Sequence, residues 1–242
     1  MATRADFLAR IRHEVRRTPG LFPASPAPRP ARPAEAADAV RRQMAERWPG
    51  ALQRFAQEFE RVSGVFHRVT GIEDVPRVIR AIARANDARE LIMWNPGELG
   101  IDLRPGLEPE RLSVAVAPSD GRDEARRRHG AAAARAQIGV TTADFALAET
   151  GTLILIAGAG RPRSTSLLPD THIAIFGKER LLETLEQVGV MLEALHADPA
   201  RAMSGAVINF ITGPSRTADI ELTLTRGVHG PKEVHAIFVE SP

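Results

Sequence analysis

The stretch that decides the fold runs from residue 173 to residue 211 and reads IAIFGKERLLETLEQVGVMLEALHADPARAMSGAVINFI. It begins and ends with short apolar runs, Ile173–Phe176 and Val207–Ile211, which predict buried strands. Between them, apolar residues recur at spacings of 4, 3, 4 and 3, at Leu181, Leu185, Val188, Leu192 and Leu195. That spacing predicts an amphipathic helix with one continuous apolar face. We therefore expect a strand–helix–strand unit with two parallel strands and a right-handed connection.

The same alternation of strands and helices is predicted from residue 65 onward. The other expected strands are Val65–Val69, Leu91–Trp94, Leu112–Ala117, Leu153–Ala157 and Ile237–Val239. The other expected helices are Ile72–Asn86 and Arg122–Ala136. Runs that are apolar on both faces are typical of parallel strands covered by helices on each side. The sequence therefore predicts a three-layer α/β fold with a mostly parallel sheet.

Residues 1–62 predict an N-terminal helical extension. Six prolines from Pro19 to Pro33 exclude a helix or a sheet ladder there and predict an extended linker. The helices expected around this linker are Met1–Arg17, Glu35–Trp48 and Ala51–Arg61, the last two separated by Pro49 and Gly50. We therefore divide the chain into an extension, residues 1–62, and an α/β domain, residues 63–242.

The composition excludes several classes of function. The chain has no cysteine, so it cannot hold a cysteine-ligated iron–sulfur cluster, use a thiolate nucleophile or form a disulfide. Its net charge of only +2 argues against nucleic acid, which is bound through a large or clustered basic excess. No apolar run approaches the roughly 20 residues that cross a bilayer. The histidine spacing indicates no metal site, and the identity of any cofactor stays unknown.

Three polar loops hold the candidate binding residues: Gly139–Thr152, Gly158–Ser166 and Thr212–Glu221. Glycine lets the backbone approach a ligand closely, hydroxyl groups form hydrogen bonds, and guanidinium groups fit phosphate or carboxylate. Ligands bind at the carboxyl ends of parallel strands, so we expect the loops to form one crevice for a small anion. The candidates, with one histidine from the turn Gly227–Pro231, are Thr141, Thr142, Thr150, Gly151, Thr152, Arg163, Ser164, Gly213, Ser215, Arg216, Thr217, Asp219, Glu221 and His229.

Each loop also has a purely structural interpretation. Thr141 or Thr142, together with Asp144, can cap a short helix that follows them. Asp219 and Glu221 can fix the hydroxyl groups of a ligand, or they can form an ion pair with Arg216. The sequence leaves these alternatives open.

Three blocks of sequence together carry a resemblance to a known family. The blocks are Gly139–Leu153, Arg163–His172, and Thr212–Glu221 with Gly227–Lys232. They resemble the signature of the LUD domain, specifically that of the lactate-utilisation protein C family. The similarity extends from Val65 to Glu240. Any one block alone would be weak, whereas the three together are specific.

The resemblance implies a fold like that of ribose-5-phosphate isomerase and the CoA-transferases. It also implies a cytoplasmic role in the oxidation of L-lactate to pyruvate, together with partner proteins that carry iron–sulfur clusters. Because this chain has no cysteine, it resembles a non-redox accessory subunit. The implied ligand is a small anion: lactate, a nucleotide or a CoA-like molecule.

A second hypothesis makes the chain an enzyme. Glu149, Thr150 and Gly151 resemble the Glu-Asn-Gly turn of CoA-transferases, in which the glutamate attacks an acyl-CoA to form a mixed anhydride. The resemblance implies that Glu149 is a nucleophile, although Thr150 stands where that turn has asparagine. Glu149 can equally be the polar end of a short helix.

Overall fold

The structure is a computed structural model that describes residues 3–17, 30–110, 112–119, 123–198, 207–218 and 224–241. The chain divides into two compact units, Met1–Ala31 and Arg32–Pro242. In the first unit, α1 (Arg4–Arg17) confirms the predicted N-terminal helix. Most of the predicted proline linker lies outside the described residues, as do Asp219 and Glu221.

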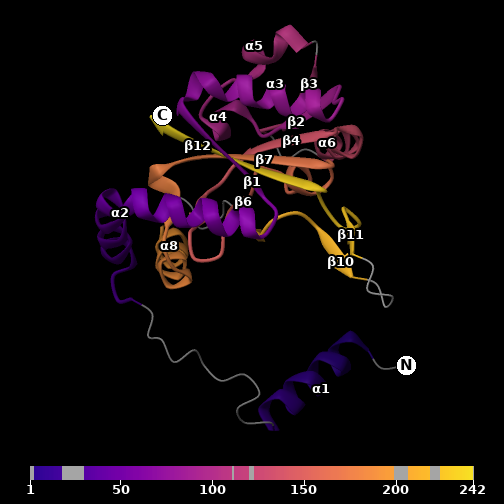
Figure 1. The fold of residues 1–242 in the computed structure, drawn as a ribbon. Helices are drawn as coiled ribbons and strands as arrows, with labels where there is room; N and C mark the ends of the chain where they lie inside the picture. Colours follow the sequence, from indigo (N-terminus) through magenta and orange to yellow (C-terminus); the bar gives the residue numbers. More distant parts are fainter. Residues whose placement is uncertain are drawn as a thin grey trace. The chain divides into compact units, whose positions relative to one another are not determined.

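A six-stranded sheet forms the centre of the second unit (Figure 1). Its strands lie in the order β1 (Val65–Gly71), β12 (Glu233–Ser241), β7 (Thr171–Gly177), β4 (Ile138–Thr142), β2 (Glu90–Met93) and β3 (Ser113–Val116). All neighbouring strands in it are parallel. Every residue of β7 is buried, as expected for a strand that is covered on both faces.

Helices lie on both sides of this sheet (Figure 1), which confirms the predicted three-layer α/β fold. On one side are α2 (Pro33–Arg61) and α8 (Leu185–Ala197), and on the other are α3 (Val75–Ala85) and α5 (Arg104–Leu107). The remaining helical segments are η1 (Ile72–Asp74), α4 (Pro96–Leu99), η2 (Glu108–Glu110), α6 (Asp123–Arg135), α7 (Ser164–Leu167) and η3 (Lys178–Arg180). In the described part of the chain, none of the helices combines the length and the apolar character that crossing a membrane requires.

α2 continues through Pro49 and Gly50, so the predicted break between two helices is wrong. A proline inside a helix removes one backbone hydrogen bond. Buried side chains on both sides of it, such as Met44 and Phe55, keep the two halves packed on the core. The ring of Phe55 lies 5.2 Å from that of Phe176 in β7, between centroids, and fixes α2 to the sheet.

A second sheet shows that the predicted strand–helix–strand unit is wrong. β9 (Val207–Ile211) does not join β7 in the central sheet but pairs antiparallel with β6 (Thr152–Ala157). The strand order of this sheet is β8 (Leu181–Leu182), β5 (Phe145–Leu147), β6 and β9. Leu181 therefore belongs to a strand, and the helix begins only at Leu185, which is 58% exposed. The remaining strands, β10 (Arg216–Ala218) and β11 (Leu224–Arg226), pair with each other.

The strand order creates a topological switch point between β2 and β4. From β2 the chain passes to β3 on one side, whereas from β4 it next enters the central sheet at β7 on the other side. Open α/β sheets bind ligands in the crevice at the carboxyl ends of the strands that flank such a point. The residues that follow Met93 and Thr142 therefore occupy the position at which such sheets bind ligands.

Candidate functional site

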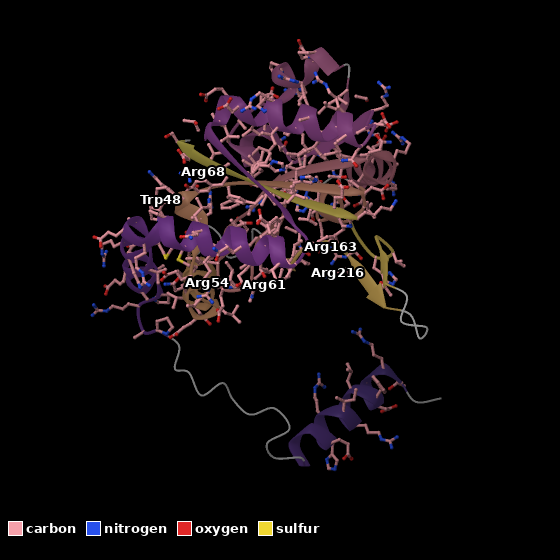
Figure 2. All side chains as sticks on the ribbon, viewed as in Figure 1. Trp48, Arg54, Arg61, Arg68, Arg163 and Arg216 are labelled. Carbon is pink, nitrogen blue, oxygen red and sulfur yellow. The ribbon has the colours of Figure 1, made fainter. Side chains whose placement is uncertain are left out.

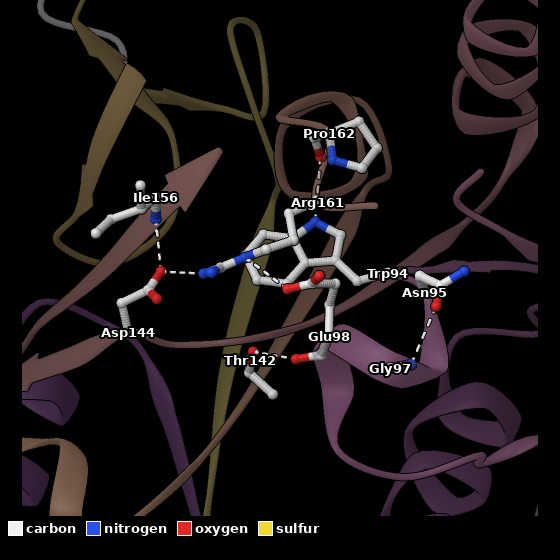
Figure 3. Close-up of polar contacts among 9 residues, drawn as sticks. All are labelled: Trp94, Asn95, Gly97, Glu98, Thr142, Asp144, Ile156, Arg161 and Pro162. Carbon is white, nitrogen blue, oxygen red and sulfur yellow. Dashed lines mark hydrogen bonds and ion pairs between the residues drawn. The ribbon is translucent and has the colours of Figure 1, made fainter. Parts of the chain in front are cut away.

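Arg161 is held at the switch point by three neighbouring side chains (Figure 3). Its guanidinium lies 4.6 Å from the centroid of the Trp94 ring and forms an ion pair with Asp144. Its Nε lies 3.9 Å from Oε2 of Glu98. Only 20% of the Arg161 side chain and 12% of the Asp144 side chain are exposed. Contacts with an aromatic face and two carboxylates fix the position of this cation at the carboxyl ends of β2 and β4.

Backbone hydrogen bonds join the two sides of this cluster. Asp144 follows β4, and its Oδ2 accepts a hydrogen bond of 2.6 Å from the backbone N–H of Ile156 in β6. The turn Gly158–Arg161 follows β6, and the carbonyl of Gly160 accepts a hydrogen bond of 3.0 Å from the N–H of Asn95. Gly160 has a φ of +70°, which glycine adopts without a steric penalty. The central sheet and the second sheet therefore meet at Arg161.

A cleft of about 510 Å³ opens beside the Asp144–Arg161 pair. Its apolar wall includes Met44, Trp48, Phe145, Ile156, Leu181, Leu182, Met191, Leu192, Leu195 and Ile208. Its polar lining consists of Arg41, Asp144, Arg161, Lys178, Glu179, Arg180 and His196. Pockets of about 300–1,000 Å³ with apolar walls and a few polar groups are typical of small-molecule sites. We call this space the α2–α8 cleft.

Cations outnumber carboxylates in the lining of the α2–α8 cleft. Asp144 is paired with Arg161, and an oxygen of Glu179 lies 3.4 Å from Nε of Arg180. In the part of the chain that the structure describes, Lys178 forms no ion pair. The exposed ammonium group of Lys178, directly after β7, is therefore available to an anionic ligand.

The structure places the predicted residues of the first two loops in different environments. Thr142 ends β4 at the carboxyl edge, where its Oγ1 lies 3.5 Å from a backbone carbonyl of α4. Thr141 is buried, and its Oγ1 lies 2.9 Å from the ring of a buried histidine. Arg163 is exposed just before α7, whose first residue is Ser164. After Asp144 comes β5, so the predicted short helix and its cap are wrong.

Most other predicted residues gather in a second place, which we call the turn cluster and define as residues 150–152, 212–217 and 227–231. The hydroxyl oxygen of Thr152 lies 2.7 Å from that of Thr150 and 2.8 Å from that of Thr212. Gly151 has a φ of +59°, and a Cβ on it would lie 2.3 Å from the backbone nitrogen of Phe59. The turn at Gly151 therefore packs directly on α2.

Hydrogen bonds also join the last two segments of the turn cluster to each other and to α2. The N–H of Ser215 donates to a backbone carbonyl in the turn before β12 at 2.9 Å, and the N–H of His229 lies 3.4 Å from Oγ of Ser215. The guanidinium of Arg216 donates to the carbonyl of Val62, just after α2. The cluster also contains Gly213 and Thr217.

The predicted single crevice is wrong, because the candidate residues lie at opposite ends of the central sheet. Thr142 is at the carboxyl end of β4, whereas Ser215 contacts the turn that precedes the amino end of β12. In Figure 2, Trp48, which lines the α2–α8 cleft, lies to the left of the centre, and Arg216 lies to the right of it. The rule for parallel strands does not apply to β6 and β9, because these strands form an antiparallel pair in the second sheet. Anion binding by the turn cluster stays a prediction.

Glu149 has a structural contact in this structure. Its Oε2 accepts a hydrogen bond of 3.0 Å from the N–H of Leu185, the first residue of α8. A carboxylate at this position satisfies an otherwise unpaired N–H group and interacts favourably with the helix dipole. Glu149 does not line the α2–α8 cleft. Its role as a nucleophile stays a prediction.

Sequence reasoning missed Trp94, Glu98, Arg161 and Lys178 as site residues. Trp94 begins a Trp-Asn-Pro-Gly turn directly after an apolar strand, which is the same signal that selected the other loops. Arg161 lies two residues before Arg163, which is one of the predicted binding residues. Lys178 is one of two lysines in the chain and directly follows β7. Applying the strand-end rule to every strand of the central sheet could have found Trp94, Glu98 and Lys178. Arg161 follows β6 in the second sheet, where that rule gives no signal.

A separate groove of about 480 Å³ beside α3 contains a pair of histidines. Nε2 of His67 lies 3.0 Å from Nδ1 of His235, whose Nε2 lies 3.3 Å from a carboxylate oxygen of Glu233. Burial, together with the charge of His235, lowers the pKa of His67 to about 4. Burial also lowers the pKa of His235. Among the described residues, no group of three or more His, Asp or Glu side chains is arranged to hold a metal ion.

Comparison with protein families gives a match to the LUD domain over residues 52–239, which is most of the chain. The chain belongs to the LUD-domain family. This confirms the resemblance that the three sequence blocks carry. The match begins inside α2, and the domain boundary between residues 62 and 63 stays a prediction.

Several relatives of this LUD-domain chain carry the name lactate utilization protein C. The one from Halalkalibacterium halodurans is 37% identical over 172 residues, which cover 71% of each chain. The one from Oceanobacillus iheyensis is 31% identical over 71% of this chain and 72% of the relative. The one from an Exiguobacterium species is 46% identical over 44% of this chain and 46% of the relative.

Among solved structures, the LUD-domain fold matches a crystal structure of a DUF162 family protein from Deinococcus radiodurans. The TM-score is 0.52 at 22% sequence identity, and the match covers 79% of this chain and 98% of that chain. At this identity the likeness concerns the fold alone.

Proposed function

We propose that this LUD-domain chain is an accessory subunit that binds a small anion and is needed for the oxidation of L-lactate to pyruvate. It acts in the cytoplasm with iron–sulfur partner proteins, which carry the electrons. The names of the relatives from Halalkalibacterium halodurans and Oceanobacillus iheyensis support the metabolic role. The absence of cysteine supports the assignment of the clusters to partners.

The single observation that carries anion binding is the α2–α8 cleft at the carboxyl ends of the central strands. Arg161 is fixed there beside Asp144, and Lys178 lies in the same lining without an ion-pair partner among the described residues. Guanidinium and ammonium groups in a partly enclosed site bind carboxylate or phosphate through charge-assisted hydrogen bonds. Each of the expected ligands, lactate, a nucleotide or a CoA-like molecule, carries a carboxylate or phosphate group.

Deletion and complementation test the metabolic role. Removal of this chain should abolish growth on L-lactate, and the wild-type chain should restore it. The purified chain alone should not oxidise lactate, whereas its addition to the iron–sulfur partners should raise their activity. Normal growth on L-lactate after deletion would contradict the proposal.

A Glu149→Gln variant separates the accessory role from the transferase alternative. The amide oxygen of glutamine can still accept the hydrogen bond from Leu185, but it cannot form an anhydride. The accessory role predicts that this variant restores growth like the wild type. Loss of growth with a normally folded variant would instead favour the nucleophile.

A further inference from the structure

We propose that the α2–α8 cleft binds an organic phosphate of nucleotide size rather than lactate. Lys178 and Arg180 hold the phosphate group, and the body of the ligand packs against α8 and Trp48. The inference rests on the proposed function, because it names the class of ligand for the same site. On this inference, lactate binds at another place in the complex.

The size of the cleft argues for a ligand larger than lactate. Its volume of about 510 Å³ falls in the range of about 300–1,000 Å³ that is typical of pockets for drug-sized molecules and cofactors. Lactate has only a few non-hydrogen atoms and would leave most of this space to water. A nucleotide or another molecule with a ring system and phosphate groups matches the volume.

The apolar wall argues for a ligand with an extended body. Leu192 and Leu195 of α8 face the cleft together with Met191, and Trp48 lines it from α2. The Trp48 ring is held by a stacked contact with Phe238, 5.8 Å between ring centroids. A small carboxylate alone would leave this wall in water, whereas a ring or a chain gains free energy by covering it.

The charged rim argues for a phosphate. Lys178 and Arg180 both belong to η3, the segment that begins directly after β7, and both line the cleft. The positive charge of Arg180 is partly compensated by the carboxylate of Glu179, whereas Lys178 forms no ion pair among the described residues. Because their side chains are exposed, these groups can turn toward a multiply charged anion. Arg41 adds a further cation from α2, although it is paired with Asp38 at 2.6 Å.

Lysine labelling of the full chain tests this inference directly. The chain has two lysines, and Lys232 serves as an internal control because it lies outside the cleft lining, in an exposed pair with Asp170 at 3.1 Å. An amine-acylating reagent is applied with ATP, with coenzyme A, with pyrophosphate or with L-lactate, and each lysine is quantified by mass spectrometry. At ten times its dissociation constant, the bound phosphate ligand should slow labelling of Lys178 by about tenfold. Labelling of Lys232 should not change.

The four probes show which part of a ligand the cleft recognises. ATP and coenzyme A carry phosphate groups and a large organic body, pyrophosphate carries phosphate groups alone, and L-lactate carries only a carboxylate. Protection by ATP alone or by coenzyme A alone supports the inference and identifies the kind of body that fits. If pyrophosphate protected Lys178 as well as ATP or coenzyme A does, the apolar wall would not contribute to binding, and the inference would be overturned. Protection by L-lactate, or equal labelling of Lys178 under all conditions, would also overturn it. These outcomes are independent of the growth test, which decides the accessory role.

A matched pair of variants gives a second readout. Lys178→Ala should weaken binding of the protecting ligand by about tenfold, as expected for the loss of one charge-assisted contact. Lys232→Ala should bind as the wild type does. Both residues are exposed, so both variants should fold. Equal affinity of the two variants would contradict a phosphate contact at Lys178.

Discussion

The guanidinium of Arg161 lies 4.6 Å from the centroid of the Trp94 ring, where the loop after β6 meets the end of β2. Asp144 and Glu98 approach the same guanidinium from other directions (Figure 3). One side chain thus connects the central sheet, the second sheet and the segment after β2. We expect its removal to affect both stability and the environment of Trp94.

Arg161→Ala should lower the free energy of unfolding by about 2–3 kcal/mol, because it leaves the mostly buried carboxylate of Asp144 without its counter-ion. Urea denaturation measures this change, and the fluorescence of Trp94 should change as well. Arg104→Ala is the matched control, since the Arg104–Asp102 pair is more than one-third exposed on both sides. Its effect should stay below about 1 kcal/mol. Equal effects of the two variants would contradict a buried role for Arg161.

Gly151→Ala should destabilise the protein strongly, by about 2 kcal/mol or more. The φ of Gly151 is +59°, and a Cβ there would lie 2.3 Å from the nitrogen of Phe59 and 2.5 Å from the carbonyl carbon of Glu58, so α2 would have to move. Gly50→Ala is the matched control inside α2, where a Cβ has nothing within 4 Å. That substitution should stabilise by about 0.5–1 kcal/mol. Thermal unfolding measures both effects: the midpoint temperature should fall for Gly151→Ala and rise for Gly50→Ala.

Phe55→Ala should lower the free energy of unfolding by about 3–5 kcal/mol, because Phe55 is fully buried among Phe59, Phe66 and Phe176. Phe7→Ala in α1, where the side chain is 60% exposed, should change it by less than about 0.5 kcal/mol. Chemical denaturation of the two variants gives both values. A small effect of Phe55→Ala would mean that the α/β domain does not need α2 for its stability. That result would favour a domain boundary at residue 62, which places α2 outside the α/β domain.

Stability should fall as the pH decreases from about 6.5 to about 4. The pKa of His67 is lowered from 6.5 to about 4, first by burial and then by the charge of His235. In this window the unfolded chain binds a proton that the folded chain does not, so protonation favours unfolding by up to about 1.4 kcal/mol per pH unit for each such histidine. Urea denaturation across this range measures the slope, and His67→Gln should make it shallower. An unchanged slope would contradict a neutral His67 in the folded state.

Positions of strands could be predicted from sequence, but their partners could not. Apolar runs such as Val65–Val69 and Ile173–Phe176 became strands, because burial in a sheet requires this composition. The run Val207–Ile211 also became a strand, yet it pairs with β6 in another sheet. Periodicity reports which side chains are buried and not which segment buries them. Phe145–Leu147, read as helix, is a strand because its pairing with β6 and β8 overrides local preference.

The candidate site was only partly predictable for the same reason. The rule that ligands bind at strand ends located Thr142 correctly at the carboxyl edge. It failed for Thr212 and Ser215, because it assumed that β9 belongs to the parallel sheet. The ring contact between Arg161 and Trp94 joins residues far apart in the sequence, and no local pattern indicates such a pair.

The position of β12 has a consequence for how the molecule is made. In chain order this strand is the last of the six in the central sheet, yet it lies between β1, the first of the six, and β7. Until those residues emerge, the nascent domain has two open edges that face each other across a gap, and other chains can pair with either. A nonsense mutation at codon 233, which removes β12 and everything after it, should therefore yield aggregated polypeptide rather than a slightly shortened native protein.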